Sequence, residues 1–187
     1  NSLYVILGLL EIKAYDDAKK YILKTQEIHE EVISKFVSIE DKYVRGLLIS
    51  RESVAKERKI EFLLTEESFL EEEHGIIDSN DIVTILGNLI ENAFEACALC
   101  GDIKKKVEVS LYEDDLVIEM QVRDNGKSID NKIRDIMFTE GISSKGEDRG
   151  TGLYLVKNRV EIYNGSIDIE EFDDEKIFVV TILKGGI

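Results

Sequence analysis

Asp124-Asn125-Gly126, followed some two dozen residues later by Gly150-Thr151-Gly152-Leu153, is the stretch that decides how this chain folds. Upstream of both segments lies a helix-like run that carries Asn88 and Asn92. An acidic residue beside a turn, a glycine-rich helix start and two amides on one helical face can converge on a single ligand. The three segments together therefore predict a nucleotide pocket.

Asp124 ends a run whose alternate residues, from Leu116 to Val122, are apolar. Because side chains alternate across a strand, Asp124 is expected on the apolar face of the sheet. A buried carboxylate needs a hydrogen-bond donor, and the exocyclic amine of adenine can supply one. Gly126 would let the backbone approach the base closely. An Asx turn at the end of a strand would also explain Asp-Asn-Gly, and the segment alone leaves both interpretations open.

Asn88 and Asn92 are four residues apart, so on a helix they lie on one face. Asparagine is unfavourable inside a helix, and two of them within an apolar stripe need hydrogen-bond partners. If they face a polar ligand, an amide oxygen can reach Mg²⁺, which takes few protein ligands when it is bound to phosphates. Two buried amides that bond to neighbouring backbone are the alternative.

The glycine-rich segment 141–152 leads into a helix that opens at Gly152. Free amides at a helix N-terminus bind phosphate, helped by the helix dipole. Lys145 and Arg149 could add cationic contacts. The segment has neither the spacing of a P-loop nor the strand that leads into a dinucleotide fingerprint, so it indicates phosphate binding only together with the other two segments.

Composition limits the class of protein. The formal net charge of −15 over 187 residues argues against direct nucleic-acid binding, because phosphate contacts need clustered lysine and arginine. Nothing near Cys97 and Cys100 completes a zinc site, and two thiols fit a reducing cytoplasm. No apolar run reaches the ~18–20 residues that span a bilayer. These features predict a cytoplasmic chain.

The first 40 residues predict a helical hairpin. Residues 1–14 continue a helix with no capping residue before it, which suggests a piece of a longer protein. Asp16 or Asp17 is expected to cap a second helix that runs to about Ile39. Two amphipathic helices cannot bury their apolar sides alone, so we expect residues 1–40 to form a homodimer through a four-helix bundle.

Residues 41–187 predict helices and antiparallel strands in alternation. The expected helices are 41–57, a long one capped by Asp78 or Ser79, about 133–138, and 151–163 with its end at Asn164-Gly165. The expected strands are 59–65, 106–112, 116–124, 166–172 and 176–183. This order favours an α+β fold, a two-layer α/β sandwich in which helices cover one face of the sheet.

Four ordered segments of residues 41–187 resemble the ATPase domain shared by sensor histidine kinases, type II topoisomerases, the Hsp90 chaperones and the MutL proteins. Residues 86–96 are similar to its N box, Asp124-Asn125-Gly126 to its G1 box, residues 137–145 to its F box, and residues 150–156 to its G2 box. The F box and the phrase Gly-Leu-Tyr-Leu-Val-Lys ending at Lys157 point to the histidine kinases. The resemblance implies the histidine kinase-like (GHKL), or Bergerat-type, ATP-binding fold.

The N-terminal hairpin resembles the citrate and C4-dicarboxylate sensor kinases, through residues 1–10 followed by Tyr15-Asp-Asp-Ala18. In that family the phosphoacceptor histidine lies four residues before the asparagine matched here by Asn1. The resemblance implies that this chain has no catalytic residue of its own for accepting phosphate, since the acceptor lies upstream of Asn1 and His29 is not that site. His74 is assigned no role.

The resemblance also implies a role for each matched residue. Asn92 would hold Mg²⁺, Asn88 would support the phosphate side, and Asp124 would bond the adenine amine. Phe138 would anchor the ATP lid. The implied ATP-binding residues are Asn88, Asn92, Asp124, Gly126, Ile129, Phe138, Lys145, Arg149, Gly150, Thr151, Gly152 and Leu153. Ser128 departs from the family pattern, which usually has a second glycine there.

The function implied is that of the catalytic core of a two-component sensor histidine kinase, an ATP-dependent protein-histidine kinase. It would bind Mg-ATP and pass the γ-phosphoryl group to a histidine and then to the receiver domain of a response regulator. The chain would be the cytoplasmic portion of a membrane sensor, with the membrane part outside it. The alternative is a degenerate module that binds a nucleotide or a partner without kinase activity. An ATPase that uses water would need a general-base carboxylate where Asn88 stands.

Overall fold

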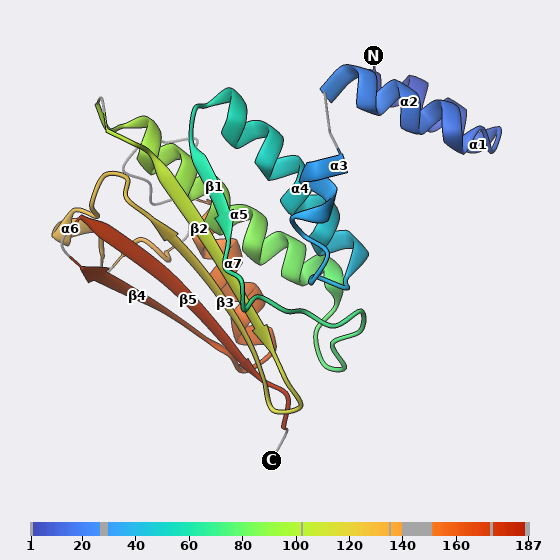
Figure 1. Cartoon of the computed structure of the whole chain (residues 1–187). Helices are drawn as coiled ribbons and strands as arrows, with labels where there is room; N and C mark the ends of the chain where they lie inside the picture. Colours follow the sequence, from blue (N-terminus) through green and yellow to red (C-terminus); the bar gives the residue numbers. More distant parts are fainter. Residues whose placement is uncertain are drawn as a thin grey trace. The chain divides into compact units, whose positions relative to one another are not determined.

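The computed structural model describes residues 2–26, 30–101, 103–134, 136–139, 151–172 and 174–185. The chain divides into two compact units, Asn1–Lys35 and Phe36–Ile187 (Figure 1). No helix within these ranges is long and apolar enough to cross a membrane.

The first unit contains α1 (Ser2–Glu11), which packs against α2 (Tyr15–Gln26), and α3 (Glu30–Ser34). A tight turn joins α1 to α2, with Lys13 at a positive φ of 58°. The expected caps Asp16 and Asp17 lie inside the first turn of α2, where carboxylates favour the helix dipole. Residues 27–29, which include His29, lie outside the described part of the chain.

The helix expected to reach Ile39 is too long at its C-terminal end, because α3 ends at Ser34. Phe36 and Ile39 are fully buried in the second unit, and Ile39 forms a parallel bridge with Leu70. The apolar positions that seemed to extend a helical stripe therefore belong to a different core. Periodicity alone does not distinguish these two uses of an apolar residue.

The second unit is built on a five-stranded sheet in the order β1-β2-β3-β5-β4. Its strands are β1 (Glu61–Leu64), β2 (Lys106–Glu113), β3 (Val117–Asp124), β4 (Ser166–Phe172) and β5 (Glu175–Leu183). The β1–β2 pair is parallel, and the other neighbours are antiparallel. The strand β5 thus lies between β3 and β4, which places residues some 50 positions apart side by side.

Helices cover one face of this sheet, and that confirms the predicted two-layer α+β sandwich (Figure 1). The central helix α5 (Ser79–Ala98) contacts β2 and β3, α7 (Thr151–Ile162) packs against α5 and β4, and α4 (Lys42–Glu57) packs against α5 and β1. The face toward the helices, called the inner face, carries alternate apolar residues of β2, β3 and β5. These buried residues are Val107, Val109, Leu111, Ile118, Met120, Val122, Phe178, Val180 and Ile182.

Local sequence signals set several helix ends. Asp41 caps α4 by accepting hydrogen bonds from the amides of Tyr43 and Val44, at 2.7 and 3.1 Å. Asp78 caps α5 as predicted. Asn164 follows α7 with a positive φ of 51°, as expected of a helix C-cap. The short helix expected at 133–138 begins earlier, as α6 (Asn131–Arg134), and residues 136–139 form turns.

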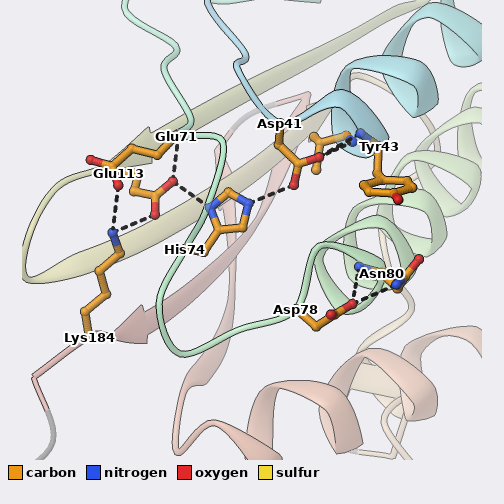
Figure 2. A network of polar contacts seen from close by, with 9 residues as sticks. Asp41, Tyr43, Glu71, His74, Asp78, Asn80, Glu113 and Lys184 are labelled. Carbon is orange, nitrogen blue, oxygen red and sulfur yellow. Dashed lines mark hydrogen bonds and ion pairs between the residues drawn. The ribbon is translucent and has the colours of Figure 1, made fainter.

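A buried polar network ties the cap of α4 to the sheet (Figure 2). His74 Nε2 lies 2.8 Å from Asp41 Oδ2, and His74 Nδ1 lies 2.9 Å from Glu113 Oε2. Both ring nitrogens thus lie within hydrogen-bond distance of buried carboxylates, so the imidazole links Asp41 to Glu113. Lys184 Nζ forms an ion pair with Glu113 Oε1 at 2.6 Å. His74, for which we predicted no role, therefore joins two segments of the core.

Candidate nucleotide-binding site

Asp124 ends β3 on the inner face and is 1% exposed, as the alternation of β3 predicted. Its Oδ1 accepts hydrogen bonds from Gly126 N at 2.9 Å and from Lys176 Nζ at 2.5 Å. The bond to Gly126 is an Asx turn, so the structural interpretation of Asp-Asn-Gly holds for this oxygen. Oδ2 is also buried, yet it has no hydrogen-bond partner among the residues that the structure describes. It can accept a hydrogen bond from a ligand.

Burial raises the pKa of the Asp124 carboxyl, and the charge and hydrogen bond of Lys176 and the amide of Gly126 oppose that rise. The net direction is upward, because removing a carboxylate from water outweighs these partners. The same burial, with the charge of Asp124, raises the pKa of Cys97 on α5 to about 11, so this thiol is neutral at physiological pH. The described residues thus bury the Asp124–Lys176 ion pair at the end of the inner face.

The loop after Asp124 lies directly on the C-terminal end of α5. A Cβ at Gly126 would come within 2.5 Å of the carbonyl carbon of Ala96 and of the nitrogen of Cys97. Lys127 N also donates to Ala96 O at 3.1 Å. We expected Gly126 to allow close approach of a base, whereas in this structure its missing side chain allows close approach of α5. Asn125 fixes the loop from the other side by accepting from Lys106 N at 2.7 Å.

The two asparagines of α5 differ in their partners. Asn88 Nδ2 donates to the carbonyl of Thr84 at 2.7 Å, as the backbone-bonded alternative proposed. Its Oδ1 would lie 2.9 Å from a Cβ at Gly152, so the start of α7 sits against this amide. Asn92 Nδ2 is buried and has no partner among the described residues. One of the two amides is therefore satisfied by the protein, and the other offers a donor to a ligand.

The remaining expected residues are only partly described. Ile129 N donates to Glu171 Oε1 at 3.1 Å, and the other oxygen of Glu171 pairs with Arg134 at 2.7 Å. Ile129, Phe138 and Leu153 are half-buried, and Thr151 is the first residue of α7. Lys145, Arg149 and Gly150 lie in the segment 140–150, which is outside the described residues. Their contribution to the site stays a prediction.

Lys176 is the residue of this site that we did not predict. In the sheet, Lys176 lies opposite Asp124 of β3 on one side and opposite Glu171 of β4 on the other. Charged residues of three neighbouring strands therefore stand side by side at this end of the inner face. The signal was present in the sequence, because Lys176 alternates with Phe178, Val180 and Ile182 and so falls on the apolar face. Its partner was not visible, since β3 and β5 are distant in the sequence.

The residues present fit a bound ATP. A buried acceptor, Asp124 Oδ2, and a buried donor, Asn92 Nδ2, both lack partners among the described residues. Gly152 opens α7 beside Asn88, and the amides of a helix start favour phosphate. The acceptor Asp124 Oδ2 suits the base of a nucleotide, and the start of α7 suits its phosphates.

Comparison with known proteins identifies the class. The family model of the histidine kinase-, DNA gyrase B- and HSP90-like ATPases matches residues 77–185. Among solved structures, the catalytic domain of histidine kinase ThkA aligns over 76% of this chain and 91% of its own, with a TM-score of 0.62 and 22% identity. The mycobacterial sensor histidine kinase MprB aligns over 75% of this chain and 93% of its own, with a TM-score of 0.57 and 23% identity. These structures confirm the fold, and the chain belongs to the histidine kinase-like ATPase family.

The more similar relatives are sensor kinases of one type. The chain is 37% identical over 171 residues to sensor histidine kinase DcuS of Escherichia coli, and the alignment covers 91% of this chain and 31% of DcuS. It is 33% identical over 172 residues to sensor histidine kinase CitA of Klebsiella pneumoniae, with the same coverage. The sensor protein CitS of Halalkalibacterium halodurans is 35% identical over 189 residues, or 98% of this chain and 35% of the relative. The resemblance to citrate and C4-dicarboxylate sensor kinases is confirmed, and the chain spans about a third of the length of these relatives.

Proposed function

We propose that this chain is the ATP-binding catalytic core of a two-component sensor histidine kinase. It binds Mg-ATP and presents the γ-phosphoryl group to a histidine, from which the group passes to the receiver domain of a response regulator. The observation that carries the proposal is the buried Oδ2 of Asp124 at the end of the inner face, which has no partner among the described residues. Family membership over residues 77–185 supports it.

Each described residue has one task in this function. Asp124 accepts a hydrogen bond from the adenine amine through Oδ2, while its Oδ1 stays bonded to Gly126 and Lys176. Asn92 turns its amide oxygen to Mg²⁺ and its partnerless Nδ2 to a phosphate oxygen. Asn88 stays bonded to Thr84 and steadies the start of α7, whose amides face the phosphates. When bound, Mg-ATP supplies the phosphoryl group and neutralises its charge.

The first unit fits a dimerisation hairpin within residues 1–40. Its helices expose a set of large apolar side chains that a second copy would cover in a four-helix bundle. The exposed residues of α1, α2 and the turn between them are Tyr4, Val5, Leu7, Leu10, Ile12 and Tyr15. A homodimer through these helices, a response regulator as partner and a cytoplasmic place in a membrane-bound sensor all follow from the proposal.

Nucleotide binding tests the core of the proposal directly. The 187-residue chain is titrated with ADP, with and without Mg²⁺, and the Asp124→Asn variant is titrated beside it. The variant places an amide beside the amine, so the loss of a charge-assisted bond is expected to weaken ADP binding by at least ~tenfold. Unchanged affinity in this variant would exclude the adenine role of Asp124.

Phosphoryl transfer needs a longer protein that restores the native residues before Asn1. This protein is incubated with γ-labelled ATP and Mg²⁺, and an acid-labile, alkali-stable label is expected. The label should disappear when the upstream histidine is replaced and survive in the His29→Ala variant. Tight nucleotide binding without any label would instead support a nucleotide-binding module that lacks kinase activity.

A further inference from the structure

Lys176 is a buried cation that contacts Asp124, the residue proposed to bind the adenine base. It is 5% exposed, and its Nζ lies 2.5 Å from Asp124 Oδ1. The same ammonium donates to the carbonyl of Lys127 at 2.9 Å. It therefore holds both the carboxylate and the loop that follows it, while Asp124 Oδ2 remains without a partner in the described structure.

A buried lysine in this place needs an explanation. The other inner-face residues of β5, Phe178, Val180 and Ile182, are apolar and fully packed. Removing two charges from water is unfavourable, and a buried ion pair is often no more stabilising than apolar residues of the same size. The pair is therefore better explained by what it does to the second oxygen of Asp124 than by stability.

The Lys176 ammonium favours the ionised form of the Asp124 carboxyl, so a ligand contacts a carboxylate and not a protonated acid. An ionised carboxylate accepts hydrogen bonds only, whereas a protonated carboxyl also donates one. The groups that face Asp124 are Lys176 from β5, Cys97 from α5 and the amide of Gly126, and the charge of Glu175 on the other face of β5 also acts on it. Glu171 of β4 lies on the far side of Lys176. Without Lys176, the carboxyl would be left buried, beside the negative charge of Glu175 and with no cation in contact with it among the described residues.

We propose that Lys176 determines the purine specificity of the site by holding Asp124 as a pure acceptor, so that the pocket takes 6-amino purines and rejects 6-oxo purines. This inference rests on the proposed function, in which Asp124 Oδ2 meets the base. An exocyclic amine donates to a carboxylate, whereas a 6-oxo group places a second acceptor against it. Two acceptors facing each other in a dry site are strongly unfavourable, since neither finds a donor. Lys176 acts through Asp124 and is a positioning residue.

ADP and inosine diphosphate (IDP) are the probes, because IDP carries a carbonyl oxygen in place of the amine. The chain is titrated calorimetrically with each nucleotide at about pH 6.5 and about pH 8.5, because loss of the cation raises the pKa of a buried carboxyl and the lower pH then favours its protonated form. The test variant is Lys176→Met. The control is Lys104→Met, which makes the same change of charge at a lysine that is 80% exposed and pairs with Glu61 at the surface.

The wild type and the Lys104→Met control are expected to prefer ADP over IDP by at least ~tenfold at both pH values. In Lys176→Met the Asp124 carboxyl loses its cation, so its pKa rises further and it takes up a proton at the lower pH. ADP binding should then weaken by about tenfold between about pH 8.5 and about pH 6.5, and the preference over IDP should narrow at the lower pH.

An equal loss for both nucleotides at both pH values would show that Lys176 only packs, and would overturn the inference. Tighter ADP binding in Lys176→Met would overturn it as well, because the ammonium would then occupy the place of the amine. If the wild type binds neither nucleotide, the proposed function itself fails. If Lys176→Met does not fold, the NMR chemical shift of the Asp124 carboxyl in the wild type decides at the pH of the binding experiments: an ionised carboxylate is expected, and a protonated carboxyl contradicts the inference.

Discussion

Replacing Gly126 by alanine would test how closely the base loop is packed on α5. A Cβ at this position would lie 2.5 Å from the carbonyl carbon of Ala96, 2.5 Å from the nitrogen of Cys97 and 2.8 Å from the Cβ of Ala96. Ordinary contact begins at 3.4 Å, so loop and helix would have to separate by roughly 0.9 Å. Helix backbone cannot rotate away as a side chain can. Gly126 has no left-handed φ, so the effect is steric.

Forcing the loop away from α5 should lower the free energy of unfolding by an amount that can be worked out from the contacts. Over-packing of this kind costs ~1–3 kcal/mol. It would also stretch the bonds from Lys127 N to Ala96 O, at 3.1 Å, and from Gly126 N to Asp124 Oδ1, at 2.9 Å. Each bond contributes ~0.5–1.5 kcal/mol. We expect Gly126→Ala to lower the free energy of unfolding by about 2–6 kcal/mol, and the melting temperature by about 4–24 °C.

Calorimetric melting of the variant measures this change, and Gly101→Ala is the matched control. A Cβ at Gly101 would meet nothing within 4 Å, and its φ is not left-handed. The control should therefore melt within about 2–4 °C of the wild type. In Gly126→Ala the shifted carboxylate should also weaken ADP binding by at least ~tenfold. If the two variants melt at the same temperature, the close packing of the loop on α5 does not limit stability and the reasoning is wrong.

Three further changes test other parts of the molecule. Asn92→Ala should remove the effect of Mg²⁺ on nucleotide affinity, and an undiminished effect in titrations would exclude Asn92 as a ligand. His74→Leu removes the imidazole that contacts two buried carboxylates, so it should lower the melting temperature by about 4–24 °C, whereas Lys42→Met breaks only an exposed pair and should shift it by no more than about 4 °C. Burial raises the pKa of Asp41, but hydrogen bonds from His74, Ser79 and the amides of α4 together lower it. Asp41 therefore stabilises the fold at a pH above its unfolded pKa of about 4, and this stabilisation is lost as the pH falls through its lower folded pKa. Denaturant melts at about pH 4 and below should show that the free energy of unfolding falls more steeply with pH in the wild type than in Asp41→Asn.

Local sequence signals were sufficient where a single element decides the outcome. The alternation of β3 placed Asp124 on the buried face, and Asp41 and Asp78 stand where carboxylates cap helices. The same reasoning failed at Phe36 and Ile39, whose helical spacing continued the stripe of the N-terminal hairpin although both residues are buried in the second unit. Spacing reports which residues are apolar, and the partner core is set by the tertiary fold.

Contacts between distant elements could not be predicted in the same way. Lys176 meets Asp124 because β5 lies beside β3, and that order follows from a sheet topology that no local pattern encodes. His74 meets Asp41 and Glu113 across 33 and 39 residues of sequence. Gly126 carried a turn signal, yet the proximity of α5 that requires a glycine there is a property of packing.

The two ends of the inner face show why one of them is a binding site. Glu113 lies at one end, where its Oε2 meets His74 and the amide of Glu71 and its Oε1 meets Lys184. Asp124 lies at the other end, where Lys176 and the Gly126 amide share Oδ1 and leave Oδ2 without a described partner. Both carboxylates are buried to a similar degree, so burial does not separate them. Glu113 Oε1 and Asp124 Oδ2 both lack a hydrogen bond among the described residues, but Glu113 Oε1 forms an ion pair with Lys184 Nζ at 2.6 Å, whereas Asp124 Oδ2 has no described partner of either kind. Under the proposed function a ligand that donates a hydrogen bond completes Asp124. Ligand binding must then add to stability, and ADP at a hundred times its dissociation constant should raise the free energy of unfolding by ~2.7 kcal/mol in the wild type.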